Sequence, residues 1–313
     1  MDKTDQRIIQ ELDKNPKLAL IKLAKKLRIS QQVTDYRLKR IFKRKQITKL
    51  TAIINLKSLG LEHYRVFFTF NSKTQYSNTR IFDYLRNKKE IYWAARIGGK
   101  FELLTVVFVK DFEEFDKFID NFNHNFPGLI RGYKSCYVTE HYIYRHKYLS
   151  RDYSCIKYGY NDKITTIDKL DNYILNKIKD NCRISSLELS KVVNVSYKTI
   201  INRIKSLEKK RIILGYRMFI KCPEHNPFII LFSFRDYSKK EEKRLISYLG
   251  MENNITQILR LFGVWNMFIH IRIEDNELLQ NFIIKLRSKF SIIDDYEIIP
   301  VFEEISINLF PIK

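Results

Sequence analysis

The chain has 313 residues, 45% of them apolar, so it is long enough to bury the cores of two or more domains. No stretch approaches the ~20 uncharged apolar residues of a membrane span, and the N-terminal MDKTDQRIIQEL lacks the apolar segment of a secretory signal. The four cysteines show neither a CxxC pair nor a histidine spacing typical of zinc, so we expect a reduced cytoplasmic protein without metal or cofactor.

The positive charge is concentrated in two segments. The net charge of the whole chain is +22, and residues 1–50 and 162–216 carry +10 and +6 of it, whereas residues 217–313 are neutral overall. A codon bias toward lysine would raise the charge everywhere, so it does not account for the neutral C-terminal quarter. Clustered basic residues are typical of proteins that bind a polyanion.

The chain consists of one two-part unit that occurs twice. Residues 29–47 and 195–213 align without a gap at an offset of 166 residues, and the offset becomes 164 later in the repeat. Equivalent pairs include Asp5 and Asp171, Leu23 and Leu189, Arg37 and Arg203, Arg96 and Arg260, and Gly99 and Gly263. So small a slip over most of the repeat indicates a tandem duplication.

The first part of each repeat predicts three helices and a strand, in the first copy at residues 4–13, 18–27, 30–43 and 47–56. Ser30 stands where an N-cap belongs, and Thr34, Leu38 and Ile41 form the inward stripe of the helix that follows. Two helices joined by a four-residue turn form a helix-turn-helix, whose second helix is available for a DNA groove. A small helical bundle without DNA binding is the alternative.

The second part predicts the order β-α-β-β-α-β, which is the ferredoxin-like plan. The expected strands are 64–70, 91–98, 101–109 and 130–142, and the expected helices are 77–88 and 111–125. The second copy repeats the order with strands near 227–235, 255–262, 265–273 and 296–304. We expect the stripe of the second helix to pack on the sheet rather than bind a ligand; it consists of Phe112, Phe115, Phe118, Ile119 and Phe122.

The predicted fold class is therefore α+β, with two repeats of a winged helix-turn-helix domain followed by a ferredoxin-like domain. The expected segments are a first helix-turn-helix domain at 1–56, a first ferredoxin-like domain at 62–144, a polar, tyrosine-rich linker at 145–163, a second helix-turn-helix domain at 164–221 and a second ferredoxin-like domain at 226–311.

Short motifs occur in the same order in both copies. The first copy has TDQRIIQEL, NPKLALIKLAKKLRIS and LKRIFKRKQI, and the second has LDNYILNKI, NCRISSLELSKVVNVS and RIKSLEKKRIILGY. GGKFELLTVV and GVWNMFIHI then follow between two strands. In these motifs and their order the chain resembles the Lrp/AsnC (leucine-responsive, feast/famine) family of prokaryotic transcriptional regulators over nearly its whole length. The resemblance implies a cytoplasmic, nucleoid-associated DNA-binding protein that is not an enzyme.

Two features depart from the family pattern. The family usually has glycine before the third helix, where this chain has Arg28 in one copy and Asn194 in the other. Asparagine tolerates a positive φ, whereas Arg28 would be mildly strained by one. The family has a Gly-x-aromatic-Asp turn, with an acidic residue after the aromatic one. This chain has Glu102 at that position in one copy and Asn266 in the other. This departure counts against a small-molecule site inherited from the family.

The resemblance implies that the third helix of each copy binds double-stranded DNA. The candidate DNA-binding residues lie off the apolar stripes and are Ser30, Gln31, Gln32, Asp35, Tyr36, Arg37, Lys39, Lys43, Ser196, Tyr197, Lys198, Asn202, Arg203 and Lys205. Glutamine pairs bidentately with adenine, and lysine or arginine binds mainly guanine or phosphate. Arg37 and Arg203 flank the core stripe, where a phosphate contact or a structural bond is favoured over base reading. For any single lysine, a solvated surface charge is the alternative.

The two third helices agree where they pack and differ where they face outward. Inward positions correspond as Leu38 with Ile204 and Ile41 with Leu207, whereas outward positions change from Gln31 to Tyr197, from Gln32 to Lys198 and from Asp35 to Ile201. Family members usually pair as homodimers on near-palindromic sites, because protein and operator share two-fold symmetry. Our hypothesis is that one chain forms a pseudo-dimer, in which TKLTAIINL pairs with LGYRMFI, on a site of two unlike half-sites.

The ferredoxin-like domains are expected to serve pairing and further assembly, including homo-oligomers. The family also binds amino acids or similar effectors near the turn between the two central strands. The corresponding residues here are Gly98, Gly99, Lys100, Phe101, Glu102, Gly263, Val264, Trp265 and Asn266. A tight hairpin that needs these glycines is the alternative.

Two other functions compete with a regulator. Sirohaem decarboxylases resemble the same two-domain plan, but they need polar and histidine side chains in the ferredoxin-like cavity. The six histidines of this chain form no matched pair between the repeats. A nonspecific nucleoid-structuring protein would show a steep salt dependence and little preference among DNA sequences.

Overall fold

The computed structural model describes residues 2–71, 78–222 and 224–312. Its contacts divide the chain into two compact units. The first unit consists of Met1–Asn55, Tyr144–Ile156 and Thr165–Pro223, and the second consists of Leu56–Ile143, Lys157–Ile164 and Glu224–Lys313. The first parts of both repeats therefore share one unit, and the second parts share the other. No helix in the described ranges is long and apolar enough to cross a membrane.

The first unit holds two three-helix bundles and a two-stranded ribbon. Its elements are α1 (Lys3–Lys14), α2 (Leu20–Leu27), α3 (Gln31–Lys43), β1 (Ile47–Ile54), α6 (Lys147–Ser150), α7 (Lys169–Ile178), α8 (Ser186–Val193), α9 (Tyr197–Lys209) and β7 (Ile213–Ile220). Thr34, Leu38 and Ile41 are the buried residues of α3, as their spacing predicts.

Each third helix begins with the same local structure. The Ser30 hydroxyl accepts a hydrogen bond from the Val33 amide, and the Ser196 hydroxyl accepts one from the Thr199 amide, so both are N-caps. The turn before each helix contains one left-handed residue, Arg28 with φ 57° and Asn194 with φ 49°. Arg28 therefore carries the strain that the sequence predicts.

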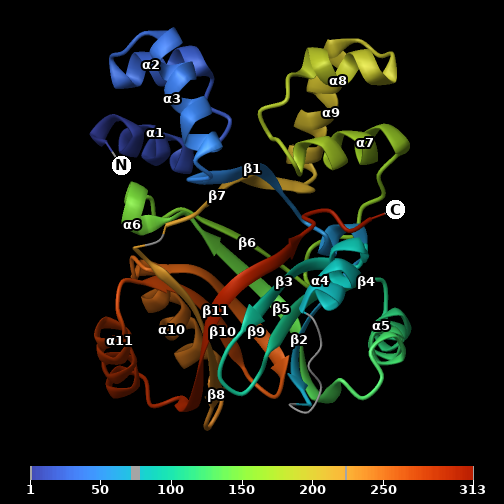
Figure 1. The fold of residues 1–313 in the computed structure, drawn as a ribbon, viewed down its shortest axis with the longest axis vertical. Coiled ribbons are helices and arrows are strands. Elements are labelled where there is room, and N and C mark those ends of the chain that lie inside the picture. Colours follow the sequence, from blue (N-terminus) through green and yellow to red (C-terminus); the bar gives the residue numbers. More distant parts are fainter. Residues whose placement is uncertain (1, 72–77, 223, 313) are drawn as a thin grey trace. The chain divides into compact units, whose positions relative to one another are not determined.

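Strands β1 and β7 pair antiparallel, which confirms the pairing expected between the copies. Ile47 lies opposite Ile220, and Ile54 lies opposite Ile213. Because Ile47 and Ile213 are equivalent positions of the repeat, this register is the one that a two-fold axis produces. Figure 1 shows the α1–α3 and α7–α9 bundles at opposite ends of this ribbon.

Side chains of both copies share the core of the first unit. Leu12, Leu38 and Leu50 of the first copy belong to one buried cluster with Cys182 and Met218 of the second. The Cys182 amide also donates to the Leu50 carbonyl at 2.8 Å. The two bundles are therefore joined by shared packing as well as by the ribbon.

The second unit holds the ferredoxin-like parts. Its elements are the 3-10 turn η1 (Lys57–Leu59), β2 (Glu62–Phe70), α4 (Asn78–Asn87), β3 (Ile91–Ile97), β4 (Leu103–Val109), α5 (Phe112–Asn125), β5 (Ile130–Tyr144), β6 (Cys155–Gly159), β8 (Asn226–Phe234), α10 (Lys239–Met251), β9 (Ile255–Gly263), β10 (Met267–Ile273), α11 (Asn276–Lys289) and β11 (Ile293–Ile307). Both copies show the predicted β-α-β-β-α-β order.

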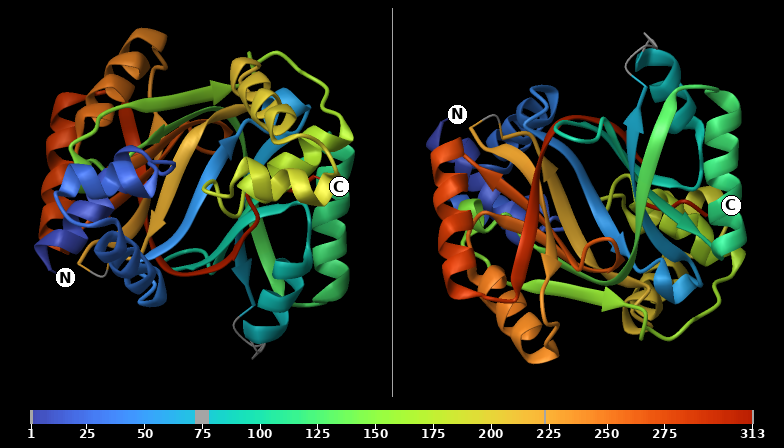
Figure 2. Two further views of the ribbon diagram at one scale, coloured as in Figure 1. Left: turned by 90° about the horizontal axis from the view of Figure 1, so that it is seen from above. Right: turned by 90° about the horizontal axis from the view of Figure 1, so that it is seen from below.

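The strands of the two copies form one closed ring rather than two separate sheets. Their order is β2-β4-β3-β11-β8-β10-β9-β5-β6, and β2 also pairs with β5, so eight strands close on themselves. The joins between the copies are β3 with β11 and β5 with β9, which are again equivalent pairs. Helices α4 and α5 lie against one half of the ring, and α10 and α11 lie against the other (Figure 2).

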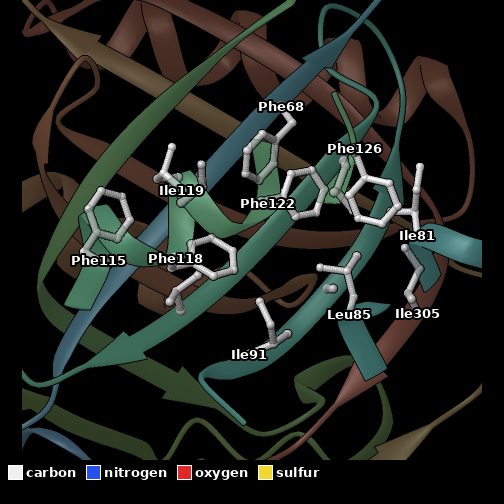
Figure 3. Packing of buried hydrophobic residues seen from close by; sticks show 14 of the residues in the cluster. Phe68, Ile81, Leu85, Ile91, Phe115, Phe118, Ile119, Phe122, Phe126 and Ile305 are labelled. Carbon is white, nitrogen blue, oxygen red and sulfur yellow. The ribbon is translucent and has the colours of Figure 1, made fainter. Parts of the chain in front are cut away.

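Two apolar cores stabilise the half of the ring that belongs to the first copy. Phe115, Phe118 and Phe122 of α5 pack on the outer face of the sheet, as the sequence predicts (Figure 3). Phe112 does not join them: it is the first residue of α5 and its side chain is 67% exposed. A second core fills the ring itself, and Phe67 contacts residues of the second copy there.

The segment expected as a linker, residues 145–163, is ordered and forms α6 and β6. In the first unit, α6 is fixed to α1 by Asp13, which is 1% exposed. The Asp13 carboxylate accepts hydrogen bonds from the His146 amide at 3.1 Å and the Ser150 hydroxyl at 2.7 Å, and His146 Nδ1 lies 2.7 Å from it. The linker therefore contributes to the packing of the first bundle.

Candidate nucleic-acid interface

The outward face of α3 carries amides, an aromatic ring and lysines. Gln31, Gln32, Tyr36, Lys39 and Lys43 are all exposed. Asp35, on the same face, is half-buried and forms an ion pair with Lys39 at 2.6 Å, one helical turn away. The face therefore combines hydrogen-bonding side chains that can read bases with cations that can bind phosphate.

Arg37 has a structural partner. Its Nη1 donates to Asp2 at 2.6 Å and to Asp5 at 2.9 Å, and Asp5 is 1% exposed. Arg40 joins from the next turn, with Nη2 2.6 Å from Asp5. The backbone hydrogen bond from Asp5 and then the hydrogen bond from Arg37 hold the pKa of Asp2 well below its usual range. These contacts fix α3 to the start of α1, so the structural bond is the alternative that the geometry favours for Arg37.

The second copy repeats this clamp in a looser form. Arg203 Nη1 donates to Asp168 at 2.6 Å but lies 3.4 Å from the nearer oxygen of Asp171. Ser206 stands where the first copy has Arg40, so a second arginine is missing. Asp5 and Asp171 are equivalent in the repeat, as are Arg37 and Arg203, but the sequence alone did not indicate that each aspartate contacts the arginine of its own copy. The presence of both the aspartate and the arginine in each copy was the sequence feature that could have revealed this contact.

The outward face of α9 is chemically different. Tyr197, Lys198, Asn202 and Lys205 are exposed, and Ile201 is half-buried. The fully buried residues of α9 are Ile200 and Leu207, and Ile204 is also only half-buried, although it is equivalent to the buried Leu38. With Lys209 at the position of Lys43, the α9 face presents a phenol, an amide and three lysines, where α3 presents two amides, a phenol and two lysines.

Side-chain contacts fix one bundle relative to the other within the first unit. Arg183 Nη1 donates to the Leu18 carbonyl at 2.8 Å, and Lys49 forms an ion pair with Asp180 at 2.9 Å. Thr51 donates to the Lys179 carbonyl at 2.5 Å. Each of these contacts joins one copy to the other, so both third helices belong to one connected unit.

In the second unit, the turns that the sequence predicts as an effector site place their aromatic residues in the core. Phe101 and Trp265 are 2% and 3% exposed, and their ring centroids lie 5.9 Å apart inside the ring. Gly99 has φ 84° and Gly263 has φ 140°, which favours the tight-hairpin interpretation of the glycines. The aromatic of each turn therefore joins the two copies together.

The acidic and amide residues of the two turns have the same role. Glu102 Oε2 accepts a hydrogen bond from the Phe70 amide at 2.8 Å, and Asn266 Oδ1 accepts one from the Phe234 amide at 2.8 Å. The sequence difference between Glu102 and Asn266 is therefore compatible with a shared structural bond. The members of the predicted effector set that remain exposed are Gly99, Lys100, Glu102, Gly263 and Val264.

Comparison with known proteins supports both helix-turn-helix domains. The family model described as winged helix-turn-helix DNA-binding matches residues 1–40 and 167–213. An uncharacterised HTH-type transcriptional regulator of Pyrococcus furiosus is 28% identical over 128 residues, which are 40% of this chain and 83% of that protein. The leucine-responsive regulatory protein of Haemophilus influenzae is 41% identical over 54 residues, which are 17% of this chain and 32% of that protein.

The chain is an Lrp/AsnC-like protein. It contains two winged helix-turn-helix domains. A segment of 40% of this chain is enough to cover 83% of the Pyrococcus regulator, so this chain is about twice as long as that protein. The length and the internal repeat together indicate that this Lrp/AsnC-like chain is a tandem duplication.

The fold of the whole Lrp/AsnC-like chain also occurs in a solved enzyme structure. The siroheme decarboxylase NirDL superposes with a TM-score of 0.67 at 9% identity, covering 97% of this chain and 92% of that chain. At this identity the likeness shows the fold alone. Two helix-turn-helix domains and two ferredoxin-like domains are therefore an arrangement that a second kind of protein shares.

Proposed function

We propose that this protein is a DNA-binding transcriptional regulator whose single chain acts as a pseudo-dimer and reads two unlike half-sites. The observation that carries the proposal is the contrast between α3 and α9. Both helices have a serine N-cap, an arginine–aspartate contact to the first helix of their bundle and a strand that follows, yet their exposed residues differ.

The symmetry of the first unit supports a dimer-like engagement of DNA. Helix-turn-helix dimers bind two half-sites about one helical turn of DNA, roughly 10 base pairs, or a multiple of it apart, because the protein and the operator share a two-fold axis. The β1–β7 register has this two-fold form within one chain. Both helices therefore belong to one folded unit and do not depend on the concentration of a second chain.

The charge of the two segments supports contact with the DNA backbone. Residues 1–50 and 162–216 supply +16 of the net charge of +22, and these segments form most of the first unit. Lysine and arginine contacts to phosphate set the register and orientation of a protein on the duplex, whereas amide side chains supply the base reading. Gln32 of α3 and Asn202 of α9 are exposed amides in this charged setting.

Paired substitutions test the proposal. The DNA upstream of the protein's own gene would be footprinted first, and affinity for that DNA and for single-base variants would then be measured by fluorescence anisotropy. Gln32→Ala and Asn202→Ala should each lower affinity by about 1–3 kcal/mol and relax the preference for bases in one half-site only. Lys205→Ala, at the position where α3 has Lys39, removes an expected phosphate contact, so it should weaken binding to all sequences and reduce the salt dependence.

The same titrations separate a regulator from a nonspecific nucleoid protein. The affinity for the footprinted DNA is compared with the affinity for a scrambled duplex. If the two affinities differ by less than about tenfold at every salt concentration, the protein binds without sequence specificity. A specific regulator should show a ratio of at least about 10³.

An enzyme with the chemistry of a sirohaem decarboxylase is the rival, because the fold of NirDL matches along nearly the whole chain. The relatives that match by sequence are named as transcriptional regulators, which favours DNA binding. A spectral change on titration with sirohaem, followed by loss of carboxyl groups from it, would replace our proposal with this rival.

A further inference from the structure

Strand β2 places two basic side chains on the inner face of the closed ring. Side chains alternate between the two faces of a strand, so His63, Arg65 and Phe67 share one face. Phe67 belongs to the core that fills the ring, which identifies this face as the inner one. Arg65 is 5% exposed and His63 is 2% exposed, so both are buried inside the second unit.

Arg65 is a buried cation without an anionic partner. Its guanidinium carbon lies 4.1 Å from the centroid of the Phe268 ring, but in the described part of the chain it forms no hydrogen bond or ion pair, and its Nε is fully buried. Burial lowers the pKa of Arg65 to about 10. The ionisable groups that act on it are Tyr158, Tyr92 and Cys136, and none of these is a carboxyl group.

His63 lies beside Arg65 and is equally unsatisfied. Neither of its ring nitrogens has a hydrogen-bond partner among the described residues, and its ring stacks on Phe108 at 4.3 Å. Burial, and then the positive charge of Arg65 and the nearby His141, hold the pKa of His63 well below its usual value. Buried polar groups are normally hydrogen-bonded, so a pair of unsatisfied basic groups in a core needs an explanation.

His141 completes the cluster from the neighbouring strand β5. Its ring centroid lies 6.0 Å from that of His63. Its two nitrogens lie 2.8 Å from the Tyr158 hydroxyl and 3.0 Å from Gln257 Oε1, so its orientation is fixed. A comparison between the repeats does not reveal this pair of histidines, because both belong to the first repeat and strand pairing brings them together there.

The second copy shows that the fold does not need an arginine here. Pro227 and Ile229 stand at the positions equivalent to His63 and Arg65, and Ile229 is fully buried in the same inner core. An apolar residue at this position therefore packs well. The first copy instead keeps a charge whose burial is costly without a partner.

We propose that Arg65, with His63 beside it, binds the carboxylate of one small organic acid inside the closed ring. An arginine fork matches a carboxylate bidentately, and a carboxylate would satisfy the donors that have no other partner. Side chains of the inner core occupy the rest of the ring, so only a small acid would fit beside Arg65. The site is independent of the DNA-binding helices and of the residues predicted as an effector site.

Thermal unfolding of the full-length protein tests the proposal. The probes are sodium salts of mono-, di- and tricarboxylic acids and the twenty amino acids, with sodium chloride at matched ionic strength. At least one acid should raise Tm in a concentration-dependent way. Arg65→Ile, which installs the residue of the second copy, should abolish this rise while raising the Tm of the ligand-free protein, because an uncompensated buried charge is removed.

Two further variants keep the test decisive. Arg96→Ile removes an arginine on β3 that is 46% exposed and should leave the response to the acid unchanged. Arg65→Lys keeps the charge but not the planar fork, so it should fold and respond at least tenfold more weakly even if Arg65→Ile does not fold. No rise in Tm with any acid, or an equal rise in Arg65→Ile or Arg65→Lys, would overturn the proposal.

Uroporphyrin III provides a separate arm, because its carboxylates share this chemistry but its macrocycle is much larger. If uroporphyrin alone raises Tm and the rise is lost in Arg65→Ile, Arg65 does bind a carboxylate. The ligand is then not a small acid, and the proposal is overturned in that respect. Stabilisation by a small acid but not by uroporphyrin is the result we expect.

Discussion

Arg37 donates a hydrogen bond to Asp5 at 2.9 Å and so joins the third helix of the first bundle to its first helix. The equivalent residues Arg203 and Asp171 face each other in the second bundle at 3.4 Å. A pair retained in both copies, while the exposed residues around it change, is expected of a scaffold that presents two different surfaces. We therefore propose that the clamp positions the outward residues of each third helix by fixing that helix to the first helix of its bundle.

Removal of Asp5 should destabilise the first unit. Asp5→Asn leaves Arg37 and Arg40 without their buried partner, so we expect the free energy of unfolding to fall by about 2 kcal/mol, less than for a fully buried pair because both arginines retain exposure. Urea unfolding followed by circular dichroism measures this change. Asp35→Asn is the control, since its ion pair with Lys39 is a surface contact on the same helix. An equal effect of the two substitutions would show that the clamp has no special role.

Glu102 should be replaceable by an uncharged acceptor. Its carboxylate binds the Phe70 amide as Asn266 binds the Phe234 amide, so Glu102→Gln should change stability by less than about 0.5 kcal/mol, whereas Glu102→Ala should cost about 1 kcal/mol. Asn266→Ala provides the matched measurement in the second copy. If Glu102→Gln destabilises as much as Glu102→Ala, the negative charge is needed and the role is not the shared structural one.

Acid should weaken the contact between α6 and α1. Burial alone would raise the pKa of Asp13, but the hydrogen bonds and charge of His146, with Ser150, outweigh it and hold the pKa below its usual value. A carboxyl group whose pKa is lowered by folding stabilises the protein above its unfolded pKa of about 4, and this contribution is lost as the pH falls through the folded pKa.

Asp13→Asn removes this contribution. At neutral pH we expect the substitution to cost about 3 kcal/mol, because a buried carboxylate with several donors is lost. Urea midpoints measured from neutral pH down to about pH 3 should fall less steeply in the variant than in the wild type. Parallel pH profiles would contradict the assignment.

Local patterns predicted most of the fold. The apolar spacing of Thr34, Leu38 and Ile41 and the serine before them located α3 and its N-cap, because both signals are confined to a few consecutive residues. The repeat then predicted the β1–β7 pairing, since a duplicated dimer must join equivalent strands. The winged helix-turn-helix matches confirmed both domains.

Features that depend on distant strands were not predictable in this way. The closure of the ring through β2 and β5 brings His63 and His141 together, although 78 positions separate them in the sequence. The burial of Phe101 and Trp265 likewise depends on how the copies face each other, so a turn motif did not reveal it. The prediction that Phe112 packs on the sheet was wrong, because helical periodicity does not show where the sheet beneath the helix ends.

Selection of binding sites from random DNA tests the central claim most directly. The wild-type protein should recover sites with two unlike half-sites, because α3 and α9 expose different residues. A variant with Gln31→Tyr, Gln32→Lys and Asp35→Ile carries the residues of the second copy at these three positions of α3, and it should recover sites closer to a palindrome. Strictly symmetric sites from the wild-type protein, or unchanged sites from the variant, would contradict the account.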